Sequence, residues 1–95
     1  MSEKPARNRS LAFREIPDEG GLVVDPRHSR VEVLNPVGSR VYALLDGEHS
    51  IEEIVASIVE EFEVEESVAR ADIEAFLADL RERDMLKGDP NSPSV

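Results

Sequence analysis

The pattern of apolar and polar residues shows three short runs rich in apolar residues along the first third of the chain, at residues 11–16, 22–25 and 30–34. Short runs of this kind, bounded by turn formers, are typical of β-strands. Residues 17–21 and 26–29 are rich in turn formers and separate the runs, so the pattern predicts an antiparallel three-stranded meander. If strand order follows chain order, the third strand is an edge of the sheet. Its unpaired N–H and C=O groups must then be covered, protected from unwanted pairing, or used to bind another strand.

An Asn-Pro corner follows the third strand and predicts the start of a first helix. Asn35 can cap the first turn with its side-chain oxygen, and Pro36 suits the first helical position. Gly47 can take the left-handed conformation that ends a helix, so we expect the helix to close there. One face of this helix would be apolar through Val37, Val41, Leu44 and Leu45.

The second helix is the clearest element of the sequence. Ser50 and Glu53 have the spacing of a capping box at its start. Apolar residues then recur at helical spacing over three turns, which predicts a face buried in the core, made of Ile51, Ile54, Val55, Ile58, Val59 and Phe62.

A third helix is predicted over residues 66–83, with a core stripe of Ala69, Ile73, Phe76, Leu77 and Leu80. One flank carries Asp72, Phe76, Asp79 and Arg83, and the other carries Arg70, Glu74, Leu77 and Arg81. Roughly opposite the core lie Ala71, Ala75 and Ala78. These alanines reflect either helix propensity or a surface that a partner approaches closely.

The predicted order is β-β-β-α-α-α, a small α+β domain of winged-helix type in which one face of the sheet packs on the helices. We expect a mobile arm at residues 1–9, the folded domain at residues 10–87 and a disordered tail at residues 88–95. Met85 and Leu86 are expected to pack back onto the domain.

The composition disfavours several classes of protein, among them nucleic-acid binders and secreted proteins. The 95 residues carry a formal net charge of −10, which disfavours DNA or RNA as a partner because such binders neutralise phosphates. There is no cysteine, and the N-terminal residues lack the apolar core of a signal peptide. With no run long enough to span a membrane, a cytoplasmic protein is expected.

No motif of catalysis or metal binding is present. Asp72 and Asp79 lie two helical turns apart along one flank, without the apolar surroundings that raise the pKa of a general acid. His28 and His49 lack metal-ligand spacing, and the serines lack a nucleophile-elbow context. A binding or adaptor domain without cofactor or metal is therefore the interpretation, and an enzyme has no support.

Several motifs recur together along residues 31–66 and 69–86: the Leu34-Asn35-Pro36-Val37-Gly38 corner, Leu45-Asp46-Gly47, Ile54 with Ile58, Asp72-Ile73, Phe76-Leu77 and Leu80. In these motifs and their order the chain resembles the PqqD family, which comprises pyrroloquinoline quinone biosynthesis protein D and its relatives, the RiPP recognition elements. One departure is Asp84, which stands before Met85-Leu86 where the family often has a glycine.

The resemblance implies a peptide chaperone. Such domains bind the leader segment of a ribosomally made precursor peptide beside the third strand, in a cleft shared with the third helix. They present it to a modifying enzyme such as a radical SAM protein, a cyclodehydratase or a leader peptidase. The peptide-binding residues implied here are Val31, Glu32, Val33 and Leu34 on the strand and Asp72, Ala75, Phe76 and Asp79 on the helix.

Several alternatives stay open at this point. Leu34 and Phe76 could serve the core alone, and Glu32 could be a charge that discourages edge aggregation. The flank of the third helix that faces the cleft is not evident from the sequence. A winged-helix DNA-binding domain and an adaptor that docks only a protein are the competing functions, and the free edge could also support a dimer.

Overall fold

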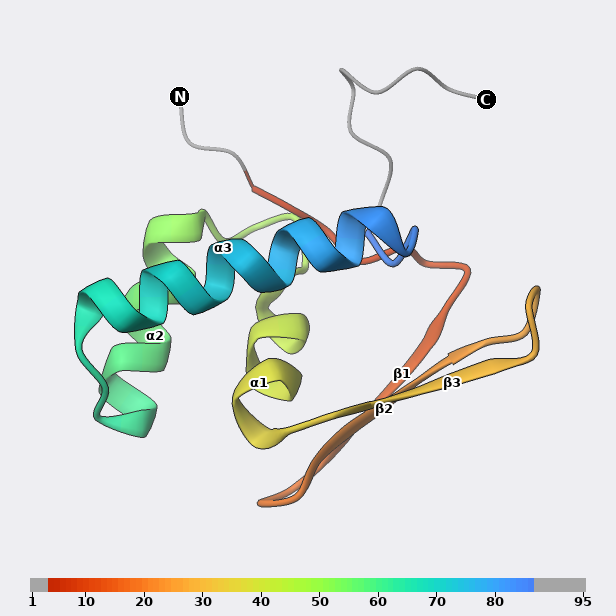
Figure 1. Ribbon diagram of the computed structural model, residues 1–95, viewed down its shortest axis with the longest axis horizontal. Helices are drawn as coiled ribbons and strands as arrows, with labels where there is room; N and C mark the ends of the chain where they lie inside the picture. The colour runs from red at the N-terminus through yellow and green to blue at the C-terminus, as the bar shows by residue number, and fades with distance from the viewer. Residues whose placement is uncertain (1–3, 87–95) are drawn as a thin grey trace.

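The computed structural model describes residues 4–86, and within them a three-stranded sheet precedes three helices (Figure 1). The predicted β-β-β-α-α-α order and α+β class are confirmed. The elements are β1 (Ala12–Ile16), β2 (Gly20–Asp25), β3 (Arg30–Leu34), α1 (Pro36–Leu44), α2 (Ile51–Phe62) and α3 (Glu66–Glu82). The tail expected at residues 88–95 lies outside the described residues, as does the predicted domain end at Lys87.

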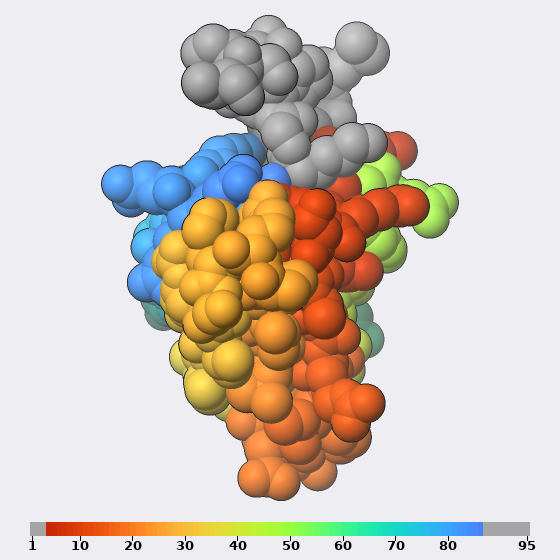
Figure 2. All heavy atoms as spheres, turned by 90° about the vertical axis from the view of Figure 1, so that its right-hand side faces the viewer, coloured from red at the N-terminus to blue at the C-terminus, as the bar shows by residue number. Residues whose placement is uncertain are grey.

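The sheet is an antiparallel meander in the order β1-β2-β3, as the strand spacing predicts. Each strand pairs with its neighbour over five positions, from Ala12↔Val24 to Ile16↔Gly20 and from Gly21↔Leu34 to Asp25↔Arg30. The β2–β3 hairpin lies between β1 on one side and the C-terminal end of α3 on the other (Figure 2). This order leaves β3 at the edge nearest α3.

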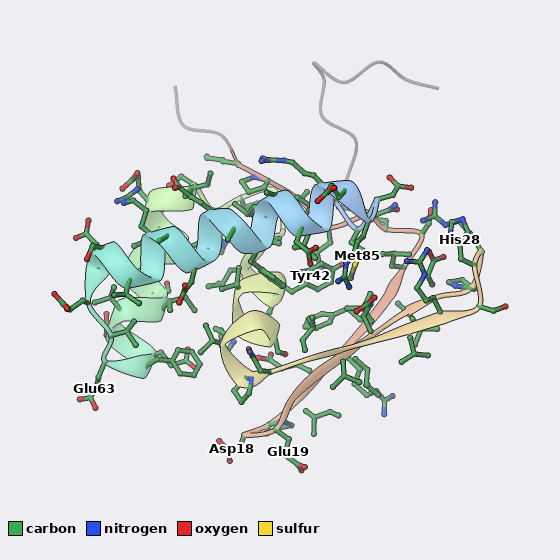
Figure 3. The ribbon with its side chains drawn as sticks, viewed as in Figure 1. Asp18, Glu19, His28, Tyr42, Glu63 and Met85 are labelled. Atoms are coloured by element: carbon green, nitrogen blue, oxygen red, sulfur yellow. The ribbon has the colours of Figure 1, made fainter. Side chains whose placement is uncertain are left out.

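One face of the sheet and the apolar faces of the helices form a single core. Val23 of β2 is buried against it, and α1 is the helix that packs directly on the sheet. Tyr42 lies at the centre, near Met85 (Figure 3). Its ring makes a T-shaped contact with the ring of Phe13, with the two ring centroids 4.9 Å apart. The buried apolar residues are Leu11, Val23, Leu34, Val41, Tyr42, Leu45, Ile54, Val55, Ile58, Ala69, Ile73, Leu77, Leu80, Met85 and Leu86.

Local sequence signals account for the starts of α1 and α2. The side chain of Asn35 accepts a hydrogen bond from the backbone N–H of Gly38 at 2.7 Å, and Pro36 is the first helical residue. Ser50 and Glu53 form the predicted capping box, with hydrogen bonds of 3.2 Å and 2.7 Å. Both satisfy N–H groups that a helix start leaves without a partner.

The predicted end of α1 at Gly47 is wrong. The helix ends at Leu44, and Leu45 follows as its C-cap, while Gly47 takes its positive φ of 81° in the next loop. The reason is that a residue distant in sequence caps the C-terminal carbonyls of the helix. Arg7 donates from Nη1 to the carbonyls of Tyr42 and Ala43 at 2.9 and 2.8 Å, so the last turn needs no left-handed glycine.

The mobile arm expected at residues 1–9 is wrong for its described part. Pro5 is buried, and its carbonyl accepts from the N–H of Gly47 at 3.1 Å. The backbone N–H of Arg7 donates to Leu45, and that of Asn8 donates to Met85. Residues 5–8 therefore join the end of α1 to the segment after α3, and the folded unit begins before residue 10.

The segment after α3 packs back as predicted, with Met85 and Leu86 buried. Asp84 turns the chain with a φ of 58°, in the left-handed region. Aspartate tolerates this region better than most residues with a side chain. Asp84 thus makes the same kind of turn that a glycine would make, which explains how the chain leaves α3 without one.

Candidate functional site

The outer edge of β3 is the free edge of the sheet. Among the residues that the structure describes, no strand pairs with it on the side away from β2. A side chain at Gly20 would collide with the carbonyl oxygen of Leu34, so this carbonyl points toward β2. Because main-chain groups alternate sides along an antiparallel strand, those of Glu32 also face β2. The N–H and C=O groups of Val31 and Val33 therefore face the free edge.

The side chains of β3 divide between two faces of the sheet. Leu34 is buried and Glu32 half-buried on the face that carries the helices, where Arg30 also belongs by alternation. Val31 and Val33 project from the opposite face and are 58% and 76% exposed. The four strand residues predicted to bind peptide therefore split into two that offer side chains toward α3 and two that offer main-chain groups.

The flank of α3 that carries Asp72, Phe76, Asp79 and Arg83 is the one turned toward this edge. Arg83 Nη1 lies 2.6 Å from Glu32 Oε2, which connects the helix to β3, and Arg83 Nε lies 3.3 Å from Asp79. Arg70, on the other flank, instead pairs with Glu52 of α2 at 2.6 Å. The structure thus answers which flank faces the strand.

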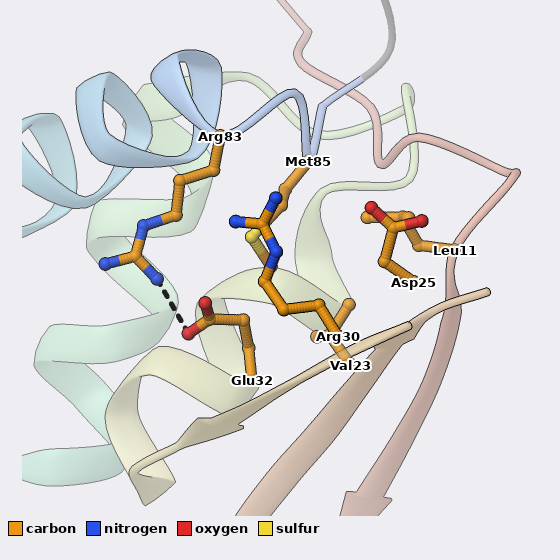
Figure 4. A pocket seen from close by; sticks show the side chains of 7 residues that line it. All are labelled: Leu11, Val23, Asp25, Arg30, Glu32, Arg83 and Met85. Carbon is orange, nitrogen blue, oxygen red and sulfur yellow. Dashed lines mark ion pairs between the residues drawn. The ribbon is translucent and has the colours of Figure 1, made fainter. Parts of the chain in front are cut away.

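The space between β3 and α3 is tight at one end, which we call the polar end (Figure 4). Its volume is about 10 Å³, no more than a single water fills. Figure 4 shows Arg83 reaching down from the end of α3 to Glu32 on β3, with Arg30 beside them. The polar end is lined by Leu11, Val23, Asp25, Arg30, Glu32, Arg83 and Met85.

Beyond the Asn-Pro corner lies a wider hollow, which we call the apolar end. It has a volume of about 390 Å³, and Phe76 borders it half-buried beside Gly38, where an added Cβ would sit 3.6 Å from the Phe76 ring. The lining is mostly apolar, from Asn35, Val37, Gly38, Val41, Ile58, Val64, Ala69, Asp72, Ile73, Ala75 and Phe76.

The eight predicted residues do not share one surface. Val31 and Val33 project from the face of the sheet away from the helices. The hollow at the apolar end has no residue of β3 in its lining. Asp72, Ala75 and Phe76 line the apolar end, and Glu32 lines the polar end. Asp79 supports Arg83 from the same helix flank. Leu34 belongs to the core, whereas Phe76 is half-buried and packs against it while also lining the hollow.

Arg83 and Arg30 are the main lining residues absent from the prediction. Arg83 shares a flank with Asp72, Phe76 and Asp79 at helical spacing, and this spacing is the signal that could have found it. Arg30 stands two residues before Glu32, on the same face of β3. Glu32 pairs with Arg83 rather than standing as an isolated edge charge.

Asp25, which lines the polar end, is held by partners in the β2–β3 turn. Asp25 accepts from His28 Nδ1 at 2.8 Å and from the backbone N–H of Arg27 at 3.0 Å. The hydrogen bond to His28, followed by those to Arg27, holds the pKa of Asp25 well below its usual range. This cluster braces the β2–β3 turn. Within residues 4–86, no group of three or more His, Asp and Glu is placed to hold a metal ion.

Comparison with known proteins gives one family and several related structures. The family model described as "Coenzyme PQQ synthesis protein D (PqqD)" matches residues 20–86. No protein with a curated description matches the chain. In the described part of the chain, no helix has the length and apolar character that crossing a membrane requires.

Three solved structures share the fold. TbiB1 in complex with the TbiA(beta) leader peptide is 27% identical, with a TM-score of 0.77 over 90% of this chain and 99% of that chain. A lasso peptide synthetase B1 complexed with the leader peptide is 22% identical, with a TM-score of 0.76 and the same coverage. The PqqD part of Methylobacterium extorquens PqqCD, described as a RiPP recognition element, is 21% identical, with a TM-score of 0.71 and 88% of each chain covered.

Proposed function

The chain belongs to the PqqD family, and from this premise we propose that it binds the leader segment of a ribosomally made precursor peptide as an added strand on β3. The observation that carries the proposal is the free edge of β3, which lies beside α3 with the main-chain groups of Val31 and Val33 turned outward. Strand addition obtains affinity from such main-chain groups and specificity from the flanking side chains.

The proposal assigns separate roles along the surface. Val31 and Val33 offer main-chain hydrogen bonds, and Glu32 and Leu34 contact the leader side chains that point toward α3. Asp79 holds Arg83 in place beside Glu32. The hollow at the apolar end, which Asp72, Ala75 and Phe76 line, receives an apolar leader residue that has passed the corner.

The complexes of related proteins support this role. TbiB1 and a lasso peptide synthetase B1 are both described with a leader peptide bound. The match with this chain covers 99% of each of these two proteins. We infer a binding role without a catalytic step, in which the domain presents its peptide to a modifying enzyme. We propose an enzyme such as a radical SAM protein, a cyclodehydratase or a leader peptidase. The proposed role belongs to the cytoplasm, where precursor peptides are made.

The test is a Val33→Pro variant titrated with a synthetic peptide that spans the leader of the precursor encoded beside the gene. Proline lacks the N–H that Val33 turns to the free edge, and edge strands accept proline because β2 loses no hydrogen bond. We expect affinity to fall by about tenfold or more, since each such hydrogen bond contributes about 0.5–1.5 kcal/mol and proline also obstructs pairing.

Val33→Ala is the matched control, because it also loses the valine side chain but keeps the N–H, so the additional loss of affinity in Val33→Pro measures the main-chain hydrogen bond. Circular dichroism and urea unfolding establish that both variants are folded. Unchanged peptide affinity in a folded Val33→Pro protein would rule out strand addition at this edge.

A further inference from the structure

The face of the sheet away from the helices exposes a cluster of apolar side chains. Among the described residues, the large apolar side chains that are exposed are Val24 at 38%, Val31 at 58%, Val33 at 76% and Val68 of α3 at 49%. Three of these four lie on this one face of β2 and β3. Single exposed valines are ordinary, but a cluster on one face indicates contact with something else.

The strand register brings these side chains together. Val24 lies opposite Val31, and Leu22 lies opposite Val33, so the two pairs form adjacent rows across β2 and β3. On this face of the three strands, Arg14 is the only charged residue. In a chain with 34% charged residues, this face is therefore unusually apolar.

Exposure of the cluster increases toward the free edge. Val24, on the central strand, is 38% exposed, whereas Val31 and Val33, on the edge strand, are 58% and 76% exposed. A flat protein surface docked on this face would cover the central strand first. A further strand beside β3 would instead cover the edge valines, which is where the uncovered apolar surface is concentrated.

We propose that side chains of the leader are recognised on both faces of the extended sheet, an inference that rests on the proposed leader binding. On the outer face, the leader carries β-branched or aromatic residues that pack on Val31 and Val33. A leader strand that adds antiparallel to β3 makes these contacts. Val31 and Val33 are the residues whose main-chain groups face the free edge, so the leader residues that bond to them lie directly opposite. Residues directly opposite share a face, and their side chains contact one another.

The leader is thus an alternating strand with two readable sets of side chains. One set enters the space between β3 and α3, beside Glu32 and Leu34. The other set, at the intervening positions, covers Val31 and Val33 on the outer face. A leader that is polar at the outward positions would keep its main-chain hydrogen bonds but lose the cross-strand pairs, so this face contributes to the choice of precursor.

The experiment compares the wild type with a V31T/V33T double variant and a V24T control, by calorimetric titration with the synthetic leader peptide named above. Threonine keeps the shape and strand preference of valine but makes the side chain polar. We expect the double variant to bind about three- to tenfold more weakly, from two cross-strand pairs, and V24T to bind within about twofold of the wild type. Urea unfolding verifies that all three proteins have similar stability.

A serine scan of the leader gives an independent readout. If the leader is recognised on both faces, serine substitutions at consecutive leader residues should each weaken binding to the domain. If it is recognised only in the cleft, serine substitutions should weaken binding at every second leader residue. The second result would overturn the proposal, as would wild-type affinity of V31T/V33T.

Other occupants of this face give different results. Unchanged leader affinity with slower modification of the precursor would assign the face to the modifying enzyme, and a dimer lost in V31T/V33T would assign it to a second copy. Either outcome overturns the proposal while leaving leader binding intact. Failure of the wild-type domain to bind the leader at all would instead reject the proposed function itself.

Discussion

Tyr42 is the residue through which the ends of the folded unit meet the core. Its hydroxyl donates to the carbonyl of Met85 at 3.0 Å, and its ring contacts the ring of Phe13 edge-on (Figure 3). The guanidinium of Arg7 lies 5.9 Å from the ring centroid. Tyr42 therefore connects α1 with the segment before β1 and with the segment after α3.

A Tyr42→Phe variant removes the hydroxyl and keeps the ring. We expect the free energy of unfolding to fall by about 0.5–1.5 kcal/mol at pH 7, because the Met85 carbonyl keeps only its hydrogen bond from Asn8. Burial raises the pKa of Tyr42 to about 12, so ionisation opposes folding above the ordinary value of 10. The advantage of the wild type should shrink as pH rises from 10 toward 12. Urea unfolding at several pH values measures both effects, and a constant difference would contradict the second.

The Asp46–His49 pair predicts a pH-dependent contribution to stability. His49 Nδ1 lies 2.9 Å from Asp46 Oδ1, and this hydrogen bond raises the pKa of His49 and lowers that of Asp46. The His49 contribution is complete below its ordinary pKa of 6.5 and disappears as pH rises through the raised value. The Asp46 contribution is present above 3.8 and is lost as pH falls through the lowered value.

A His49→Gln variant should therefore be less stable than the wild type at pH 5 and similar to it at pH 8.5. Urea unfolding at the two pH values provides the measurement. An equal deficit at both pH values would show that protonation of His49 does not stabilise the fold.

At the scale of elements, the helix starts depend on single capping residues. Ser50 accepts from the N–H of Glu53, and Glu53 accepts from the N–H of Ser50. Ser50→Ala should destabilise the domain by about 1 kcal/mol, because it leaves an N–H of the first turn without its partner. Ser57→Ala, in the middle of the same helix, is the control and should cost nothing, since alanine favours a helix interior. A chemical denaturation series tests both, and equal stability of the Ser50→Ala variant would contradict the cap.

Elements specified by neighbouring residues could be predicted from the sequence. The caps at Asn35 and Ser50, the third strand and the meander order all depend on residues a few positions apart. The end of α1 could not be predicted, because its cap is Arg7, whose guanidinium comes from outside the helix. The attachment of residues 5–8 depends on the same long-range contacts.

The candidate site was predictable to a similar degree. Alternation shows that Glu32 and Leu34 share a face of β3, and helical spacing places Phe76, Asp79 and Arg83 on one flank of α3. Neither pattern reveals which face or flank turns toward the other element. The ion pair between Glu32 and Arg83 settles that question, and it exists only once the chain has folded.

At the scale of the whole molecule, the sheet packs on one side of the helices (Figure 1). Within residues 4–86, no strand pairs with the outer edge of β3. The core holds the two layers in place, with Leu34 buried at the end of β3 and the Glu32–Arg83 pair crossing from the middle of the strand. A bound strand would therefore extend a sheet that is already formed. Preorganisation of this kind reduces the ordering cost of binding.

Amide hydrogen exchange along β3, with and without the synthetic leader peptide, tests the central claim most directly. In the free domain, we predict slow exchange at Glu32 and Leu34, whose N–H groups face β2, and fast exchange at Val31 and Val33. Saturating peptide should slow exchange at Val31 and Val33 by about tenfold or more, because added hydrogen bonds protect those amides. Unchanged exchange at Val31 and Val33 in a peptide-saturated domain would contradict strand addition to β3.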